Sequence, residues 1–146
     1  MISGGSTKGP EQYICFQLAR VMRKVQRYYE GNLAQYEITP VQFYVLNALS
    51  VKDGMKFKDL AKSVGIDGST LTGILDRMER GGFIERRDDP EDRRSLLVFL
   101  TPKAREIGPE IIELAEKLDR NIRGQFSPDE LEICLGVLDR LSVPGV

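Results

Sequence analysis

The chain has 146 residues, of which 41% are hydrophobic and 29% are charged, and its formal net charge is −1. This length fits one domain with a core of its own, and the composition is that of a globular protein, which argues against disorder. The chain has no histidine, the commonest general base and a common zinc ligand, so the sequence argues against an enzyme and predicts neither a metal nor a cofactor.

The small net charge is the sum of unlike parts. Residues 52–105 carry twelve basic and ten acidic groups, whereas residues 106–146 carry four and nine. The middle of the chain can therefore present a basic surface. No apolar stretch is long enough to cross a bilayer, and the first residues have no apolar segment of the kind that a secretory signal carries. We therefore expect a cytoplasmic protein without a membrane partner.

Helices are expected over the first part of the chain. Apolar residues from Glu11 to about Tyr36 recur at steps of three and four, which predicts one long amphipathic helix. A strong helix start is formed by Thr39, Pro40 and Gln42, because threonine caps the first turn, proline fits the first helical position and glutamine can close a capping box. This second helix is expected to end near Val51, and residues 56–65 predict a short third helix.

A further helix and a hairpin follow. Residues 66–82 predict a helix that Asp67 or Ser69 can cap and that the Gly81-Gly82 pair ends. Two runs rich in branched and aromatic residues, 83–87 and 95–100, predict the strands of a β-hairpin. The tip of this hairpin carries four arginines and four carboxylates within residues 86–94.

Two helices complete the chain. Thr101-Pro102 starts the first, and Pro109 is expected to kink or break it early. Ser127-Pro128 starts the second. Together with the first helix of the chain, these helices carry longer apolar stripes than a small central domain needs, so we expect two copies to bury them in a homodimer.

The helix within residues 66–82 carries two different faces. Its apolar residues fall on one side, and short hydroxyls, a glycine and arginines fall on the other. Such a polar face suits close approach to base edges and phosphates in a DNA groove. Two helices, a glycine turn and a hairpin in this order predict a winged helix-turn-helix. An ordinary solvated surface helix is the alternative.

From the first predicted helix to the last, the chain resembles the MarR (multiple antibiotic resistance regulator) family. The most specific part is "STLTGILDRMERGGFIERRDDPEDRRSLLVFLT", residues 69–101. The resemblance implies a mainly α fold with a small β-hairpin wing, and one MarR-like domain over residues 1–146. Within it we expect a winged DNA-binding lobe at 39–101, flanked by a dimerisation region at 10–36 and 102–146. Members of this family bind pseudo-palindromic double-stranded promoter DNA as dimers, and most are repressors that a small ligand or oxidation releases.

The resemblance and the charge pattern give a set of candidate DNA-binding residues. They are Ser69, Thr70, Thr72, Gly73, Arg77, Arg80, Arg86, Arg87, Arg93 and Arg94. In similar wings the arginine that matches Arg94 enters the minor groove, and we expect Asp92 and Asp67 to orient it. Asp88, Asp89 and Pro90 are expected to shape the loop, and a merely solvated loop is the alternative. The candidates for phosphate contacts are Arg86 and Arg87 at the base of the wing and Lys56, Lys58 and Lys62 near the third helix, and plain surface charge is the alternative for each.

The effector is open at this stage. Cys15 lies where the hydroperoxide sensors of the family have a reactive cysteine and Tyr29 matches one of their tyrosines, but Pro40 and Phe43 replace two others, so we expect a buried, inert thiol. A redox sensor acting through Cys15 is the alternative. The other possibility is a small aromatic or phenolic effector that binds in a pocket. The candidate residues for this pocket are Cys15, Phe16, Tyr36, Phe43 and Tyr44. A winged helix used only for protein contacts is the rival from another class.

Overall fold

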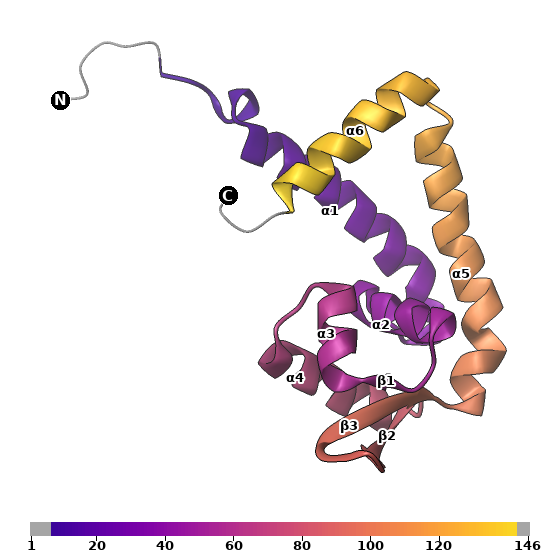
Figure 1. The fold of residues 1–146 in the computed structure, drawn as a ribbon. Helices are drawn as coiled ribbons and strands as arrows, with labels where there is room; N and C mark the ends of the chain where they lie inside the picture. The colour runs from indigo at the N-terminus through magenta and orange to yellow at the C-terminus, as the bar shows by residue number, and fades with distance from the viewer. Residues whose placement is uncertain (1–6, 143–146) are drawn as a thin grey trace. The chain divides into compact units, whose positions relative to one another are not determined.

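The computed structural model describes residues 7–142, which form two compact units divided between Ile111 and Ile112. The elements are η1 (Pro10–Gln12), α1 (Ile14–Leu33), η2 (Ala34–Tyr36), α2 (Pro40–Val51), β1 (Met55–Lys56), α3 (Phe57–Val64), α4 (Gly68–Arg80), β2 (Ile84–Asp89), β3 (Asp92–Leu100), α5 (Pro102–Arg123) and α6 (Pro128–Leu141). Figure 1 traces this order along the chain. The predicted fold, mainly helical with a small β-hairpin wing, is confirmed.

Local signals in the sequence start and end the helices of the first unit. Thr39 Oγ1 accepts from the Gln42 backbone N–H (3.3 Å), and Gln42 Oε1 accepts from the Thr39 N–H (3.1 Å), which is the predicted capping box of α2. Gly65 ends α3 in the left-handed conformation (φ 70°), which a glycine adopts without strain. These local signals fix where α2 begins and α3 ends.

The three strands form an antiparallel sheet in the order β1-β3-β2. Arg86 of β2 lies opposite Val98 of β3, and the register shifts between Asp88 and Asp89 at the wing tip. The sequence did not predict β1, because its two residues are too short to show an alternating pattern. β1 pairs with β3 through Met55 and Lys56, so it fastens the segment before α3 to the wing.

The core of the first unit joins the helices to the sheet. Its fully buried large side chains are Leu33, Val45, Leu49, Leu60, Leu71, Leu75, Met78, Ile84, Val98 and Ile111. They come from α1 to α5 and from both wing strands, so α4 and the wing are anchored in one hydrophobic core. In Figure 1 the β2–β3 hairpin projects from the helical part of this unit.

The second unit contains the rest of α5 and all of α6. Within residues 112–142 no side chain is buried, although the sequence there is amphipathic. Ser127 caps α6 in the predicted capping box with Glu130. Pro109 was predicted to kink or break this helix; it does not break it, because α5 continues through Pro109. Proline there removes one N–H donor to the Arg105 carbonyl, and the rest of this 22-residue helix retains its form.

Candidate nucleic-acid interface

Helix α4 separates its side chains into two faces. Leu71, Ile74, Leu75 and Met78 are buried in the core. The opposite face is exposed and carries Ser69, Thr70, Thr72, Arg77 and Arg80, with Gly73 partly covered. The arginines and hydroxyls of this helix are therefore available to a partner, as the sequence predicted.

Asp67 organises the first turn of α4. Its Oδ1 accepts from the Ser69 hydroxyl (2.7 Å) and from the Thr70 backbone N–H (2.8 Å), and its Oδ2 accepts from the Thr70 hydroxyl (2.8 Å). These bonds lower the pKa of the Asp67 carboxyl to about 2, and the bond from Ser69 has the largest effect. No ion pair joins Asp67 to Arg94 within residues 7–142, and the Asp67 carboxylate instead caps its own helix, so its role in orienting Arg94 stays a prediction.

The hydroxyl groups at this end of α4 all donate inward. Ser69 and Thr70 donate to the Asp67 carboxylate, and Thr72 donates to the Gly68 carbonyl (2.9 Å). Carboxylates and carbonyls only accept, so these hydroxyls present their lone pairs outward. In a major groove this arrangement favours the amino groups of adenine and cytosine, whereas the nearby arginines favour guanine.

The acidic residues of the wing hold its tip in shape. Asp89 is buried (4% exposed), and its Oδ1 accepts from the Glu91 backbone N–H (2.9 Å), while its Oδ2 lies 3.8 Å from Lys56 Nζ. Asp92 Oδ1 accepts from the Arg94 backbone N–H (3.0 Å). The expected loop-shaping role of Asp89 is confirmed. Asp92 supports Arg94 through the main chain, and Lys56 pairs with the wing.

The arginines predicted to bind DNA fall into two groups. Arg86 bridges Asp76 and Glu79 of α4, and Arg87 pairs with Glu85 and lies over the Phe99 ring. The others are exposed, and no acidic side chain within residues 7–142 forms an ion pair with them: Arg77, Arg80, Arg93 and Arg94. The second group is free to meet phosphates or base edges. The geometry does not support the prediction that Arg86 contacts a phosphate.

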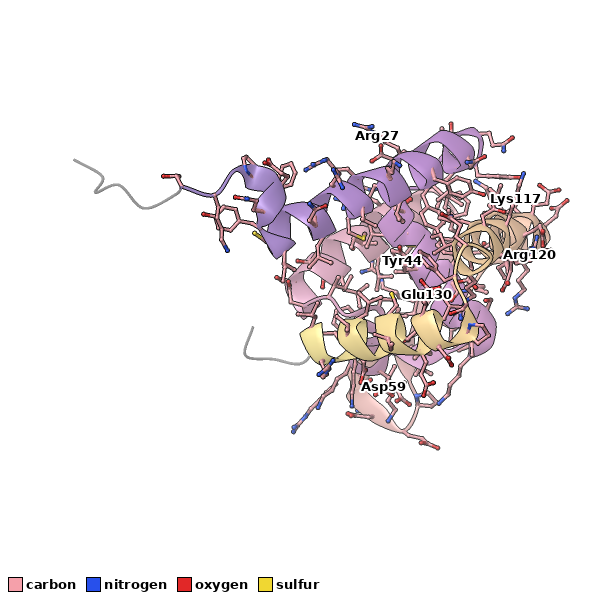
Figure 2. All side chains as sticks on the ribbon, turned by 90° about the horizontal axis from the view of Figure 1, so that it is seen from above. Arg27, Tyr44, Asp59, Lys117, Arg120 and Glu130 are labelled. Carbon is pink, nitrogen blue, oxygen red and sulfur yellow. The ribbon has the colours of Figure 1, made fainter. Side chains whose placement is uncertain are left out.

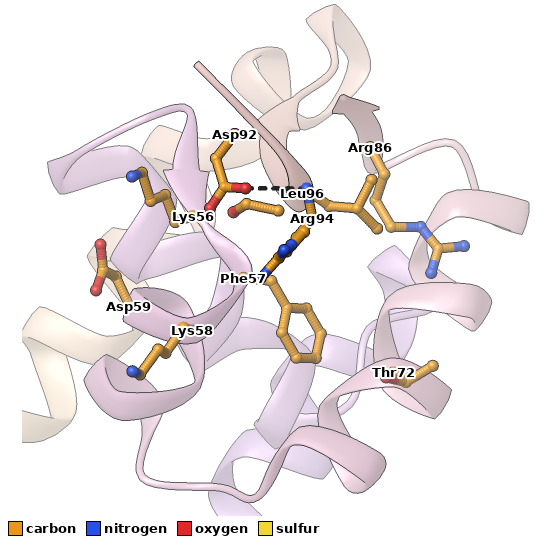
Figure 3. Close-up of a pocket in the computed structure, with 10 residues that line it drawn as sticks. Lys56, Phe57, Lys58, Asp59, Thr72, Arg86, Asp92, Arg94 and Leu96 are labelled. Atoms are coloured by element: carbon orange, nitrogen blue, oxygen red, sulfur yellow. Dashed lines mark hydrogen bonds between the residues drawn. The ribbon is translucent and has the colours of Figure 1, made fainter. Parts of the chain in front are cut away.

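A cleft of about 640 Å³ lies between the wing, α3 and α4. Its wall carries more positive than negative charge, and Thr72 adds a hydroxyl from α4. The cations are Lys56, Lys58, Arg86 and Arg94, and the carboxylates are Asp59 and Asp92. Figure 3 shows these side chains around the cleft, with the hydrogen bond from the Arg94 main chain to Asp92 drawn as a dashed line. The cleft is suited to an anionic edge such as a nucleic-acid backbone.

Of the residues proposed for an effector pocket, Phe43 and Tyr44 meet in this chain, with 5.6 Å between their ring centroids, whereas Cys15 lies far from Phe43. Phe43 is buried and stacks on Tyr29 at 5.3 Å between ring centroids. Cys15 precedes Tyr29 by fourteen residues of α1, which is about 21 Å along a helix axis. Cys15 is exposed, so the expected burial of this thiol is wrong for the single chain.

Three of the pocket residues also have contacts elsewhere. The Tyr36 hydroxyl donates to Glu110 Oε2 (2.7 Å), and this bond raises the pKa of Tyr36. Tyr44 borders a separate groove of about 540 Å³ with Asn47 and Val51, and Phe16 lies beside Arg23. The bond between Tyr36 and Glu110 joins residues 74 positions apart, so it could not be predicted from the sequence.

Two classes of feature were not found among the described residues. Residues 7–142 contain no group of three or more histidine, cysteine or acidic side chains that could hold a metal ion. No helix in the same range combines the length and apolar character needed to span a membrane.

These features define a winged helix-turn-helix with a polar recognition face on α4. The MarR family model matches residues 38–96. The chain is 30% identical to the HTH-type transcriptional regulator MgrA of Staphylococcus aureus over 109 residues. These residues make up 74% of this chain and 74% of MgrA. This chain therefore belongs to the MarR family and is a DNA-binding transcriptional regulator.

Solved structures agree with this assignment. The transcriptional repressor CouR, bound to a 23-mer DNA duplex, is 25% identical, with a TM-score of 0.78 over 97% of this chain and 100% of CouR. BpsR of Bordetella bronchiseptica, whose DNA binding is regulated by 6-hydroxynicotinic acid, is also 25% identical, with a TM-score of 0.83 over 96% of this chain and 100% of BpsR.

Proposed function

We propose that this chain is a homodimeric repressor that binds a pseudo-palindromic operator through α4 and the wing. The observation that carries this proposal is the pair of faces on α4, with Leu71 and Leu75 buried and Thr72 and Arg77 exposed. A core-anchored helix of this kind can enter a major groove without losing its own packing. The exposed Arg94 then contacts DNA beside it, in the minor groove.

The dimer in this proposal is supported by apolar side chains that the single chain leaves exposed. On α1 they include Ile14 (74% exposed), Leu18, Val21 and Met22. On α6 they include Ile133 (68% exposed), Leu135 and Leu138. Exposed apolar stripes of this length are typical of subunit interfaces. The division into a winged lobe at 39–101 and dimerisation segments at 10–36 and 102–146 stays part of the proposal.

We further propose that a small aromatic acid or phenol releases the DNA. The ligand dependence of BpsR supports this class of effector. Its pocket would need residues of both subunits, because Cys15 and Phe43 of one chain lie far apart. Oxidation of Cys15 is the weaker alternative. The proposal includes no enzymatic step and places the protein's action in the cytoplasm.

The proposal is tested by selecting duplexes from a random pool with the wild-type chain. A repressor of this type enriches a sequence with two related half-sites about one helical turn apart. Its affinity for that sequence falls steeply between about 50 and 200 mM salt, because DNA binding releases counterions. A chain that enriches no sequence is a protein-interaction module, and the proposal is then wrong.

A further inference from the structure

Arg86 links the base of the wing to α4. Its Nη2 lies 2.7 Å from Asp76 Oδ1, and its Nε lies 2.6 Å from Glu79 Oε2. The Arg86 side chain is only 24% exposed, whereas that of the neighbouring Arg87 is 59% exposed. The guanidinium therefore faces α4, where Asp76 and Glu79 occupy two of its nitrogens, although Arg86 also lines the cleft between the wing, α3 and α4.

The two carboxylates that Arg86 holds lie on the helix that faces DNA. Asp76 and Glu79 are three residues apart and belong to one side of α4, next to the exposed Arg77 and Arg80. Without a partner, both carboxylates would repel the phosphates of a bound duplex. The hydrogen bonds to these carboxylates raise the pKa of Arg86, and the bond to Glu79 has the largest effect. Arg86 therefore keeps its positive charge.

The same contact fixes the wing. Residues 81–82, which connect α4 to β2, are glycines, and Gly82 has a φ of 78°. Arg86 lies in β2 beyond this turn, and β2 pairs with the strand that carries Arg94. A guanidinium can donate along two directions to two carboxylates at once, which an ammonium group does less well. Arg86 thus holds the wing at a set position against the helix.

We propose that Arg86 is a positioning residue for DNA binding, which neutralises Asp76 and Glu79 and fastens the wing to α4 without contacting a phosphate. This inference rests on the proposed function. It differs from the sequence prediction, in which Arg86 was one of several phosphate contacts. The two roles predict opposite coupling between Arg86 and its carboxylate partners.

The coupling is measured with a double-mutant cycle on duplexes selected by the wild-type chain. Arg86→Gln should lower affinity about tenfold, and in the Asp76→Asn, Glu79→Gln background the same change should lower it less than about threefold. The slope of affinity against salt should stay the same. If Arg86 contacts a phosphate, Arg86→Gln should lose as much affinity or more in the Asp76→Asn, Glu79→Gln background, and the slope of log affinity against log salt should fall by about one. That result would overturn the inference.

Two further variants keep the test decisive. Arg86→Lys retains the charge but should still lower affinity in the wild-type background, because an ammonium group does not donate to Asp76 and Glu79 in the same two directions. If Arg86→Lys does not lower affinity in either background, the inference is contradicted. Arg87→Gln is the matched control and should lose the same factor in both backgrounds. Thermal unfolding identifies any variant that fails to fold, and Arg86→Lys then serves in place of Arg86→Gln.

The outcomes separate the two proposals. If the wild-type chain enriches no duplex, the proposed function fails. If the wild-type chain binds specifically but the loss from Arg86→Gln does not shrink in the neutral background, only the role of Arg86 is wrong.

Discussion

At Asp67, one carboxylate caps α4 and aligns the hydroxyls that face DNA. Because its folded pKa of about 2 lies below the ordinary value of 3.8, its stabilising effect is complete above pH 3.8 and is lost as the pH falls through about 2. Asp67→Ala should therefore lower the melting temperature at neutral pH, and the difference from wild type should shrink below pH 3.8. Asp67→Asn is the control: it keeps one cap acceptor, so it should lower the melting temperature at neutral pH less than Asp67→Ala does, and the pH dependence due to this carboxyl should be absent.

Arg94 is the exposed cation on which the wing contact depends. Arg94→Ala should weaken binding to the selected duplex by about 1 to 3 kcal/mol, because a guanidinium in a narrow minor groove is lost, and the dimer should remain intact. Anisotropy titration measures the affinity, and sedimentation checks the dimer. Lys117→Ala removes one positive charge from α5 (Figure 2) and should leave affinity unchanged. Equal affinities of Arg94→Ala and wild type would remove the wing from the interface.

At the scale of single elements, Gly73 sits in the middle of α4 on its DNA side. A Cβ at this position would meet only the Arg77 side chain, at 4.0 Å, so alanine fits the free protein. Gly73→Ala should raise the free energy of unfolding by about 0.5 to 1 kcal/mol, since glycine disfavours helix interiors. Affinity for the selected duplex should fall, because the added methyl group lies between the helix and the base edges.

The control for this element is Gly31→Ala in α1, where a Cβ would meet nothing within 4 Å. It should give a similar gain in urea denaturation and leave DNA affinity unchanged. If Gly73→Ala binds the duplex as tightly as wild type, then the α4 backbone does not approach the bases closely.

The elements also show where sequence reasoning works. Helix α2 was predicted with its cap because Thr39, Pro40 and Gln42 act locally. Strand β1 was missed because its two residues are set by pairing with β3. The partners of Arg86 were missed for the same reason: Asp76 and Glu79 lie seven to ten residues away, on another element. Residue type predicted the exposed polar face of α4, whereas the ion pairs of Arg86 depended on tertiary contacts.

At the scale of the whole molecule, DNA binding by two half-sites depends on the dimer. Val21 is 56% exposed within the apolar stripe of α1. Val21→Asp should raise the dimer dissociation constant at least about 100-fold, because a carboxylate would enter an apolar interface without a partner. Sedimentation velocity over a range of concentrations measures this change, and affinity for a duplex with two half-sites should fall with it.

The matched control carries its charge change on the other side of the same helix. Arg27 lies six residues after Val21 and is exposed (Figure 2). At about 100° per residue, its side chain is about 240° further around α1. Arg27→Glu should leave the dimer intact, so a loss of dimer in Val21→Asp alone assigns the interface to the apolar stripe. If Val21→Asp remains a dimer at nanomolar concentration, the subunits meet through other surfaces, and the spacing of the two α4 helices on DNA must be set by those.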